Sequence, residues 1–199
     1  MQEEYALKSK EVVNIIAIGD FHIGSKQFNK DFFKQMLKQI RDLPRRRIYL
    51  MGDCIEVATK SVGDSAFQTE CTVDEQREYF INNIKPFKDD IVGYCMGNHE
   101  YRLNKEYGYN IVKDMCRELG INHYNQSIDT FRVNDFDFSV YTRHGKGSSQ
   151  RRHLGYPLCF FNFAAAMALG SFSGLERLIV ISISPYLLPV THFTSFLIL

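Results

Sequence analysis

The feature of this 199-residue chain that most limits what it can fold into is a set of three short polar clusters. Each cluster directly follows a run of apolar residues. The clusters are Gly19-Asp20-Phe21-His22, Gly52-Asp53 and Gly97-Asn98-His99-Glu100. A buried strand that ends in glycine and then offers a carboxylate, imidazole or amide brings oxygen and nitrogen donors to one edge of a sheet. Any one cluster by itself is better explained as a hydrogen-bonded turn or a helix cap. Three in succession predict a metal site at that edge.

The segments between the clusters alternate between strand and helix patterns. Short apolar runs predict buried strands at residues 12–18, 48–51 and 91–96. Apolar residues at helical spacing predict helices at residues 31–40, from Thr72 to Pro86 behind a capping box with Glu75, and at 111–119 before Gly120. This β-α-β order indicates an α/β fold.

A predicted hairpin supplies a fourth polar cluster. Alternating apolar residues at 130–133 and 136–142 flank Asn134-Asp135, a typical turn dipeptide. The second strand leads directly into His144 and Gly145.

The residue types in these clusters match the chemistry of a divalent ion. Asp20 and His22 are separated by one residue, so both can hold the same ion. Asp53 can bridge two ions, because each carboxylate oxygen has spare lone pairs. Asn98 offers a neutral carbonyl oxygen and His144 a nitrogen to the second ion. This mixture of donors suits Mn, with Fe and Zn as alternatives, better than a soft metal.

His99 is predicted to act on the substrate. It follows a predicted ligand directly, so its side chain is expected to face away from that ion. An imidazole with a near-neutral pKa can protonate a leaving group, which makes His99 the candidate catalytic acid.

The succession DxH, GD, GNHE and HG resembles the calcineurin-like metallophosphoesterase superfamily over residues 12–150. The resemblance implies a two-sheet β-sandwich flanked by helices, in four α/β/β/α layers. It implies an enzyme that hydrolyses phosphomonoesters or phosphodiesters with two divalent metal ions and a bridging hydroxide.

The same resemblance assigns residue roles. Asp20 and His22 would bind the first ion, Asp53 would bridge, and Asn98 and His144 would bind the second. Substrate contacts are expected from Asn98, His99 and Arg102, with Glu100 close by.

One signature block is missing. Members of the superfamily carry a GHxH block behind a late strand, whereas here the apolar run Leu178–Ile183 is followed by Ser184 and Pro185. The fold is therefore expected to be incomplete at its C-terminal end, and a shifted reading frame is one hypothesis for the change. The alternative function is a catalytically degenerate domain of this fold that serves as a binding module.

The composition changes near residue 155. We expect a metallophosphoesterase core at residues 1–155 and an atypical apolar segment at 156–199, in which Glu176 and Arg177 are the only charged side chains. Residues 158–175 are uncharged and about as long as a membrane span requires, but polar and glycine residues within them disfavour a membrane helix.

Other side chains are weaker candidates. Glu56 either orients a ligand or faces solvent. His123, His153 and His192 lack the paired spacing of the missing block and are expected to be structural.

The overall charge limits the expected partners. The formal net charge is +1, so a phosphoester substrate, including a nucleotide or nucleic acid, would depend on local contacts. Five cysteines without CxxC spacing favour reduced thiols and a cytoplasmic location.

Overall fold

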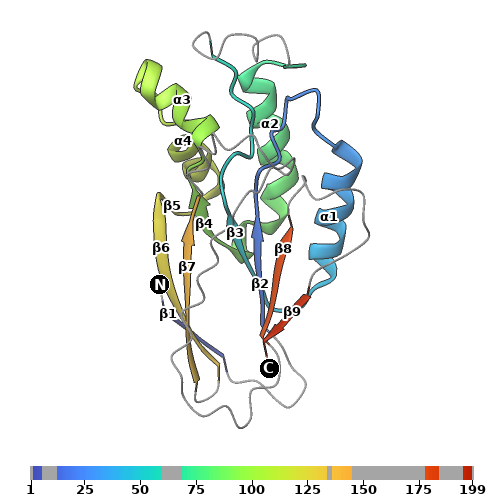
Figure 1. The fold of residues 1–199 in the computed structure, drawn as a ribbon, viewed down its shortest axis with the longest axis vertical. Helices are drawn as coiled ribbons and strands as arrows, with labels where there is room; N and C mark the ends of the chain where they lie inside the picture. Colours follow the sequence, from blue (N-terminus) through green and yellow to red (C-terminus); the bar gives the residue numbers. More distant parts are fainter. Residues whose placement is uncertain are drawn as a thin grey trace, which may run out of the picture.

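The computed structural model describes residues 2–5, 13–59, 69–133, 136–144, 178–183 and 195–198. Two β-sheets pack face to face, and helices cover the outer face of the larger sheet (Figure 1). The α/β class and the two-sheet arrangement with helices are confirmed. Within the described part of the chain, the helices supply one outer layer.

The larger sheet has six strands and carries the predicted β-α-β order. Its strand order is β5 (His123–Tyr124), β4 (Ile91–Cys95), β3 (Arg46–Leu50), β2 (Val13–Ile18), β8 (Leu178–Ile183) and β9 (Ser195–Ile198). All neighbours pair in parallel except β8 and β9. The predicted strands correspond to β2, β3 and β4, and the apolar run expected before the missing block is β8.

The smaller sheet contains the predicted hairpin. It consists of β1 (Gln2–Tyr5), β6 (Gln126–Val133) and β7 (Phe136–Arg143), with β6 between the other two. Val133 pairs with Phe136 across the turn, so the hairpin forms in the expected register. The first strand, β6, begins at Gln126, four residues before its predicted start, whereas β7 ends at Arg143, one residue beyond its predicted end.

Local signals set the helix ends. The side chain of Asn29 caps α1 (Lys30–Asp42), and Thr72 and Glu75 form the predicted capping box of α2 (Val73–Ile84). A 3₁₀ helix, Lys85–Asp90, follows α2. Gly120, at φ +72°, ends α4 (Ile111–Leu119) in the left-handed conformation. One helix, α3 (Asn98–Tyr107), was not predicted.

The protein has two hydrophobic cores, one under the helices and one between the sheets, and alternating side chains of β2 belong to each. Ile16 and Ile18 belong to the cluster under the helices, whereas Ile15 and Ala17 belong to the cluster between the sheets. Burial on both faces explains why the strand reads as a continuous apolar run.

The middle of the apolar C-terminal segment, including residues 158–175, lies outside the described residues, as do His153 and His192. None of the helices in the described part of the chain has the length and apolarity to cross a bilayer. His123 is exposed at the start of β5.

Candidate metal centre

The loops that follow β2 and β3 are joined side by side. The backbone N–H of Asp20 donates to the carbonyl of Gly52 at 2.9 Å, and that of His22 donates to the carbonyl of Asp53 at 3.0 Å. These bonds continue the pairing of two parallel strands beyond the sheet. The predicted ligands of the first two clusters therefore lie next to one another, at the carboxyl ends of the strands.

Three of these side chains sit on strained backbone. Asp20, His22 and Asp53 have φ values of +54°, +51° and +49°, in the left-handed region that costs a residue with a side chain about 1–2 kcal/mol. Gly52, at φ +84°, could not carry a Cβ, which would lie 2.5 Å from the backbone nitrogen of Gly97. Strain of this kind persists where surrounding contacts fix it, and it is common at functional sites.

The start of α3 and the end of β7 complete the cluster. The Asp53 carboxylate accepts the backbone N–H of His99 at 2.8 Å. The His144 Nε2 lies 2.9 Å from the Asn98 Oδ1 and 3.3 Å from the Asp53 Oδ2. The structure thus brings Asp20, His22, Asp53, Asn98, His99 and His144 together at one edge.

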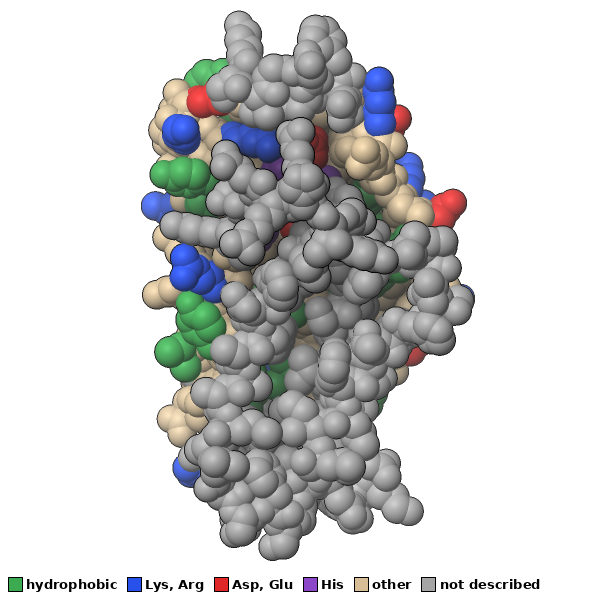
Figure 2. Space-filling model, viewed as in Figure 1, with side chains coloured by type: hydrophobic (Ala, Val, Ile, Leu, Met, Phe, Trp, Pro, Cys, Tyr) green, Lys and Arg blue, Asp and Glu red, His purple; other side chains and the backbone are tan. Residues whose placement is uncertain are grey.

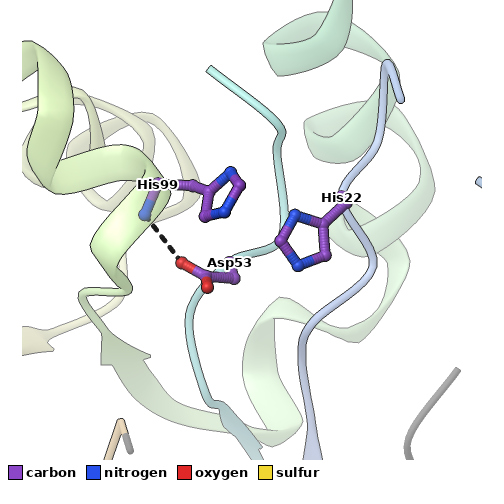
Figure 3. A group of neighbouring side chains, drawn as sticks. All are labelled: His22, Asp53 and His99. Atoms are coloured by element: carbon purple, nitrogen blue, oxygen red, sulfur yellow. Dashed lines mark hydrogen bonds between the residues drawn. The ribbon is translucent and has the colours of Figure 1, made fainter. Parts of the chain in front are cut away.

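Two groups of donor atoms share Asp53. His22, Asp53 and His99 form one group, shown in Figure 3, and Asp20, Asp53 and His144 form the other. Within each group the ligand atoms lie within 4.8 Å of one another. Histidine and acidic surfaces are visible together in the upper part of the space-filling view (Figure 2). Asp53 thus belongs to both groups. The grouping differs from the prediction in two ways: Asp20 lies with His144 rather than with His22, and His99, which was expected to face away from the ion, offers a ring nitrogen to the first group.

Glu56 lies beside both imidazoles of the first group. Its Oε2 is 2.8 Å from the His22 Nδ1, and its Oε1 is 3.4 Å from the His99 Nδ1. The His22 and His99 rings meet edge to face, with centroids 4.3 Å apart. Of the two roles considered for Glu56, the structure favours the one that orients a ligand, because the carboxylate is only 12% exposed and holds His22 through its Nδ1.

Arg102 contacts the protein rather than open solvent. Its guanidinium donates to the carbonyls of Glu56 and Val57 at 3.2 and 3.3 Å, and lies 3.0 Å from the His99 Nε2. Because the Arg102 guanidinium can only donate, the His99 Nε2 must accept from it. The ring proton of His99 is then on Nδ1, which lies 2.8 Å from the Glu56 carbonyl. Arg102 and His99 therefore form one hydrogen-bonded unit.

Charges of the same sign are crowded in this site. Burial, together with the charge of Asp53, raises the pKa of Asp20 to about 6. For Glu56, burial by itself would raise the pKa. Hydrogen bonds from His22 and His99 outweigh that effect and lower the pKa of Glu56 to about 2. A bound cation would relieve the repulsion between the Asp20 and Asp53 carboxylates.

His144 forms an electrostatic pair with Asp53, which shifts the pKa of both groups. Burial disfavours its charge, but the hydrogen bond and charge of Asp53 raise the pKa of His144 to about 9. The same contact lowers the pKa of Asp53 below its usual value, against the effect of burial. The His144 Nδ1 lies 2.7 Å from the carbonyl of Met51, which fixes the ring so that Nε2 faces Asp53 and Asn98.

The donor set fits a divalent cation. It offers carboxylate oxygens, an amide oxygen and imidazole nitrogens, whereas the buried thiol of Cys54 turns to the Gly52 carbonyl at 3.7 Å. Hard and borderline donors of this kind suit Mn, Fe or Zn.

Several contacts of the site were not predicted from the sequence. Two groups belong to residues that look like ordinary core positions in the sequence: the Met51 carbonyl and the Tyr94 hydroxyl. The hydrogen bonds of Glu100 were not predicted either. Glu100, expected only to lie near the site, is fully buried within it.

The strand β8 ends beside the first cluster. It pairs in parallel with β2, and its last residue, Ile183, lies opposite Ile18, two residues before Asp20. Residues 184–194, which follow β8, lie outside the described part of the chain, and the sequence there begins with Ser184 and Pro185 in place of the expected histidines.

Comparison with known proteins agrees with this arrangement. The sequence profile of the calcineurin-like phosphoesterases matches residues 13–168, which contain every predicted ligand. No curated protein and no solved structure matches the chain in the corresponding searches. Members of the matching family are generally phosphoester hydrolases that bind divalent metals. Since the match covers more than half of its length, the chain belongs to the calcineurin-like phosphoesterase family.

Proposed function

We propose that this chain hydrolyses phosphomonoesters or phosphodiesters with two divalent ions, held by Asp20, His22, Asp53, Asn98 and His144. The observation that carries the proposal is the pair of donor groups that share Asp53. Manganese is the first choice of ion, and iron and zinc are the alternatives. When bound, such ions lower the pKa of a coordinated water and neutralise charge on the phosphoryl oxygens.

The protein's part in this reaction is to hold groups in place. Glu56 and the Met51 carbonyl hold the rings of His22 and His144 through their Nδ1 atoms, and the Nε2 of His144 faces Asp53. The strained turns at Asp20 and Asp53 hold the carboxylates in position before a substrate arrives. Preorganised groups of this kind need no rearrangement during the reaction.

We assign the substrate contacts to Asn98, His99 and Arg102. Asn98 is exposed, and it adjoins both His144 and the His99–Arg102 unit. In this proposal, the doubly protonated ring of His99 gives its Nε2 proton to the leaving group. The neutral ring that remains keeps its Nδ1 proton toward the Glu56 carbonyl, and its Nε2 then accepts from Arg102, which is the arrangement in the structure. Nucleotides and nucleic acids are included among the candidate substrates. The four described cysteines are free thiols, which supports a reducing, cytoplasmic setting.

The test is turnover of a nitrophenyl phosphomonoester and of a bis-nitrophenyl phosphodiester by the purified full chain with Mn²⁺. We expect metal-dependent release of nitrophenol, and a loss of at least about 100-fold in Asp53→Asn. Folded protein that binds Mn²⁺ but hydrolyses neither ester would contradict the proposal.

A second candidate function is a binding module of the same fold. It is favoured by one observation: β8 ends opposite Ile18, two residues before Asp20, and the sequence that follows β8 begins with Ser184 and Pro185 instead of a histidine pair. Calorimetric titration separates the two functions. Close to two ions per chain supports the enzyme, and one or none supports the module.

A further inference from the structure

Glu100 is a carboxylate with no exposed surface, and it lies directly behind the proposed ligands. Five donors reach its two oxygens at 2.7 to 3.3 Å: the backbone N–H groups of Asp53, Cys54, Ile55 and Gly97, and the hydroxyl of Tyr94. A buried anion is costly unless its lone pairs are satisfied. Here backbone dipoles and one hydroxyl satisfy them.

Three of these donors are consecutive residues of the loop that carries Asp53. The N–H groups of residues 53, 54 and 55 all turn toward the same carboxylate. They can do so because Asp53 adopts φ +49°, a conformation that is unfavourable in an isolated chain. Glu100 therefore supplies contacts that hold the strained turn, and the turn aims the Asp53 side chain at His144 and the start of α3.

Tyr94 connects this carboxylate to the hydrophobic core. Its ring is fully buried on β4 and packs against Phe80 of α2, with centroids 5.6 Å apart. Its hydroxyl donates to the Glu100 Oε1 at 2.9 Å. Because the core fixes the ring, the hydroxyl is held at one place and limits the positions that the Glu100 carboxylate can take.

We propose that Glu100 and Tyr94 are positioning residues that preset the turn at Asp53 for metal binding. Neither side chain touches the ion or the substrate. Tyr94 acts through Glu100, and Glu100 acts through the backbone of residues 53–55. The inference rests on the proposed role of Asp53 as a shared ligand, and it adds the residues that make that role possible.

The first experiment compares two Tyr→Phe variants of the full chain by calorimetric titration with Mn²⁺. In Tyr94→Phe, which keeps the ring and removes the hydroxyl, we expect the Mn²⁺ affinity to fall about tenfold, as is usual for the loss of an outer hydrogen bond. The matched control is Tyr49→Phe, which removes the same atom from the neighbouring strand β3. Tyr49 is equally buried but belongs to the cluster between the sheets, so its Mn²⁺ affinity should match the wild type. Unchanged affinity in Tyr94→Phe, or an equal loss in both variants, overturns the proposal.

The second experiment measures how well the turn at residues 53–55 is held in place, and it requires neither bound metal nor enzymatic activity. Glu100→Gln keeps the side-chain shape but turns an amide NH₂ toward backbone N–H groups. We expect hydrogen exchange at the amides of residues 53–55 to become at least about tenfold faster, while exchange in α1 stays the same. Exchange that is unchanged at these amides overturns the proposal.

These readouts separate this inference from the proposed function. If Mn²⁺ binding and amide protection respond as expected but no ester is hydrolysed, only the hydrolase proposal fails. If the wild-type chain binds no divalent ion, both fail.

Discussion

Glu56 lies 2.8 Å from the Nδ1 of His22, although 34 residues separate the two in the sequence. This carboxylate holds the His22 ring through Nδ1, and it also lies beside His99 and Arg102. Carboxylates that hydrogen-bond to metal-binding histidines commonly contribute 10- to 100-fold to metal affinity.

Replacing Glu56 should therefore weaken metal binding. In Glu56→Gln the amide can accept from only one imidazole, so we expect the Mn²⁺ affinity to fall about 10- to 100-fold by calorimetric titration. Glu78→Gln, which makes the same change at an exposed position of α2, is the control and should bind as the wild type does. Equal affinities for both variants would show that the Glu56 contact does not organise the site.

The crowding of Asp20 and Asp53 predicts an unusual stability effect. Since the pKa of Asp20 is raised from 3.8 to about 6, its stabilising contribution is complete below about pH 4 and is lost as the pH rises through 6. Asp20→Asn mimics the protonated form, and asparagine tolerates the left-handed φ of this position. At pH 8 we expect the metal-free variant to be about 1–3 kcal/mol more stable than the wild type, with little difference at pH 4.

Urea unfolding of the metal-free proteins at both pH values measures this difference. The control is Asp42→Asn, at the exposed end of α1, which should change the free energy of unfolding by less than about 0.5 kcal/mol at either pH. Addition of Mn²⁺ should reverse the order of stability, because only the wild type keeps the full ligand set. A variant that is less stable at pH 8 without metal would count against the crowded-carboxylate explanation.

Metal binding should release a proton from His144. With a pKa of about 9 in the metal-free protein, this imidazole is protonated at pH 7 and must become neutral to bind an ion. Titrations with Mn²⁺ in buffers of different ionisation enthalpy should give about one proton released per chain at pH 7. In His144→Gln the proton release should fall close to zero, and retention of the full release would assign it to another group.

Much of the fold follows from local signals in the sequence. The strands β2, β3 and β4 are apolar runs of the length expected for buried parallel strands, and the capping box at Thr72 marks the start of α2. Three of the polar clusters were found because each begins with a glycine behind an apolar run, and the fourth, at His144, because it directly follows the second strand of the hairpin. Such signals involve only neighbouring residues, which is why the sequence alone reveals them.

The features that were missed depend on distant contacts. The helix α3 has one buried side chain, the charged Glu100, so its sequence lacks the apolar periodicity that identified the other helices. Likewise β1 is a short, mostly polar segment that pairs with β6 across more than 120 residues of sequence. Glu56 and Tyr94 owe their roles in the site to partners that only the folded chain brings close.

A methyl group at Gly97 tests how tightly the site is packed. Gly97 has an ordinary φ of −86°, so Gly97→Ala introduces no backbone strain. However, the added Cβ would lie 2.2 Å from both the backbone nitrogen and the Oδ1 of Asp53, and 2.6 Å from the Glu100 Oε2, so the Asp53 turn and both carboxylates would have to shift. We expect the variant to lose at least about 2 kcal/mol of stability and most of its Mn²⁺ affinity.

The matched control for Gly97→Ala is Gly108→Ala, at the C-terminal end of the same helix. At Gly108 a Cβ would meet nothing within 4 Å, but φ is +69°, so the substitution costs only the left-handed strain of about 1 kcal/mol. Thermal unfolding with and without Mn²⁺ distinguishes the two variants. The increase in melting temperature on adding Mn²⁺ should survive in Gly108→Ala and disappear in Gly97→Ala, because only the second substitution displaces proposed ligands. An equal increase in both would mean that Asp53 and Glu100 do not need the positions that the structure gives them.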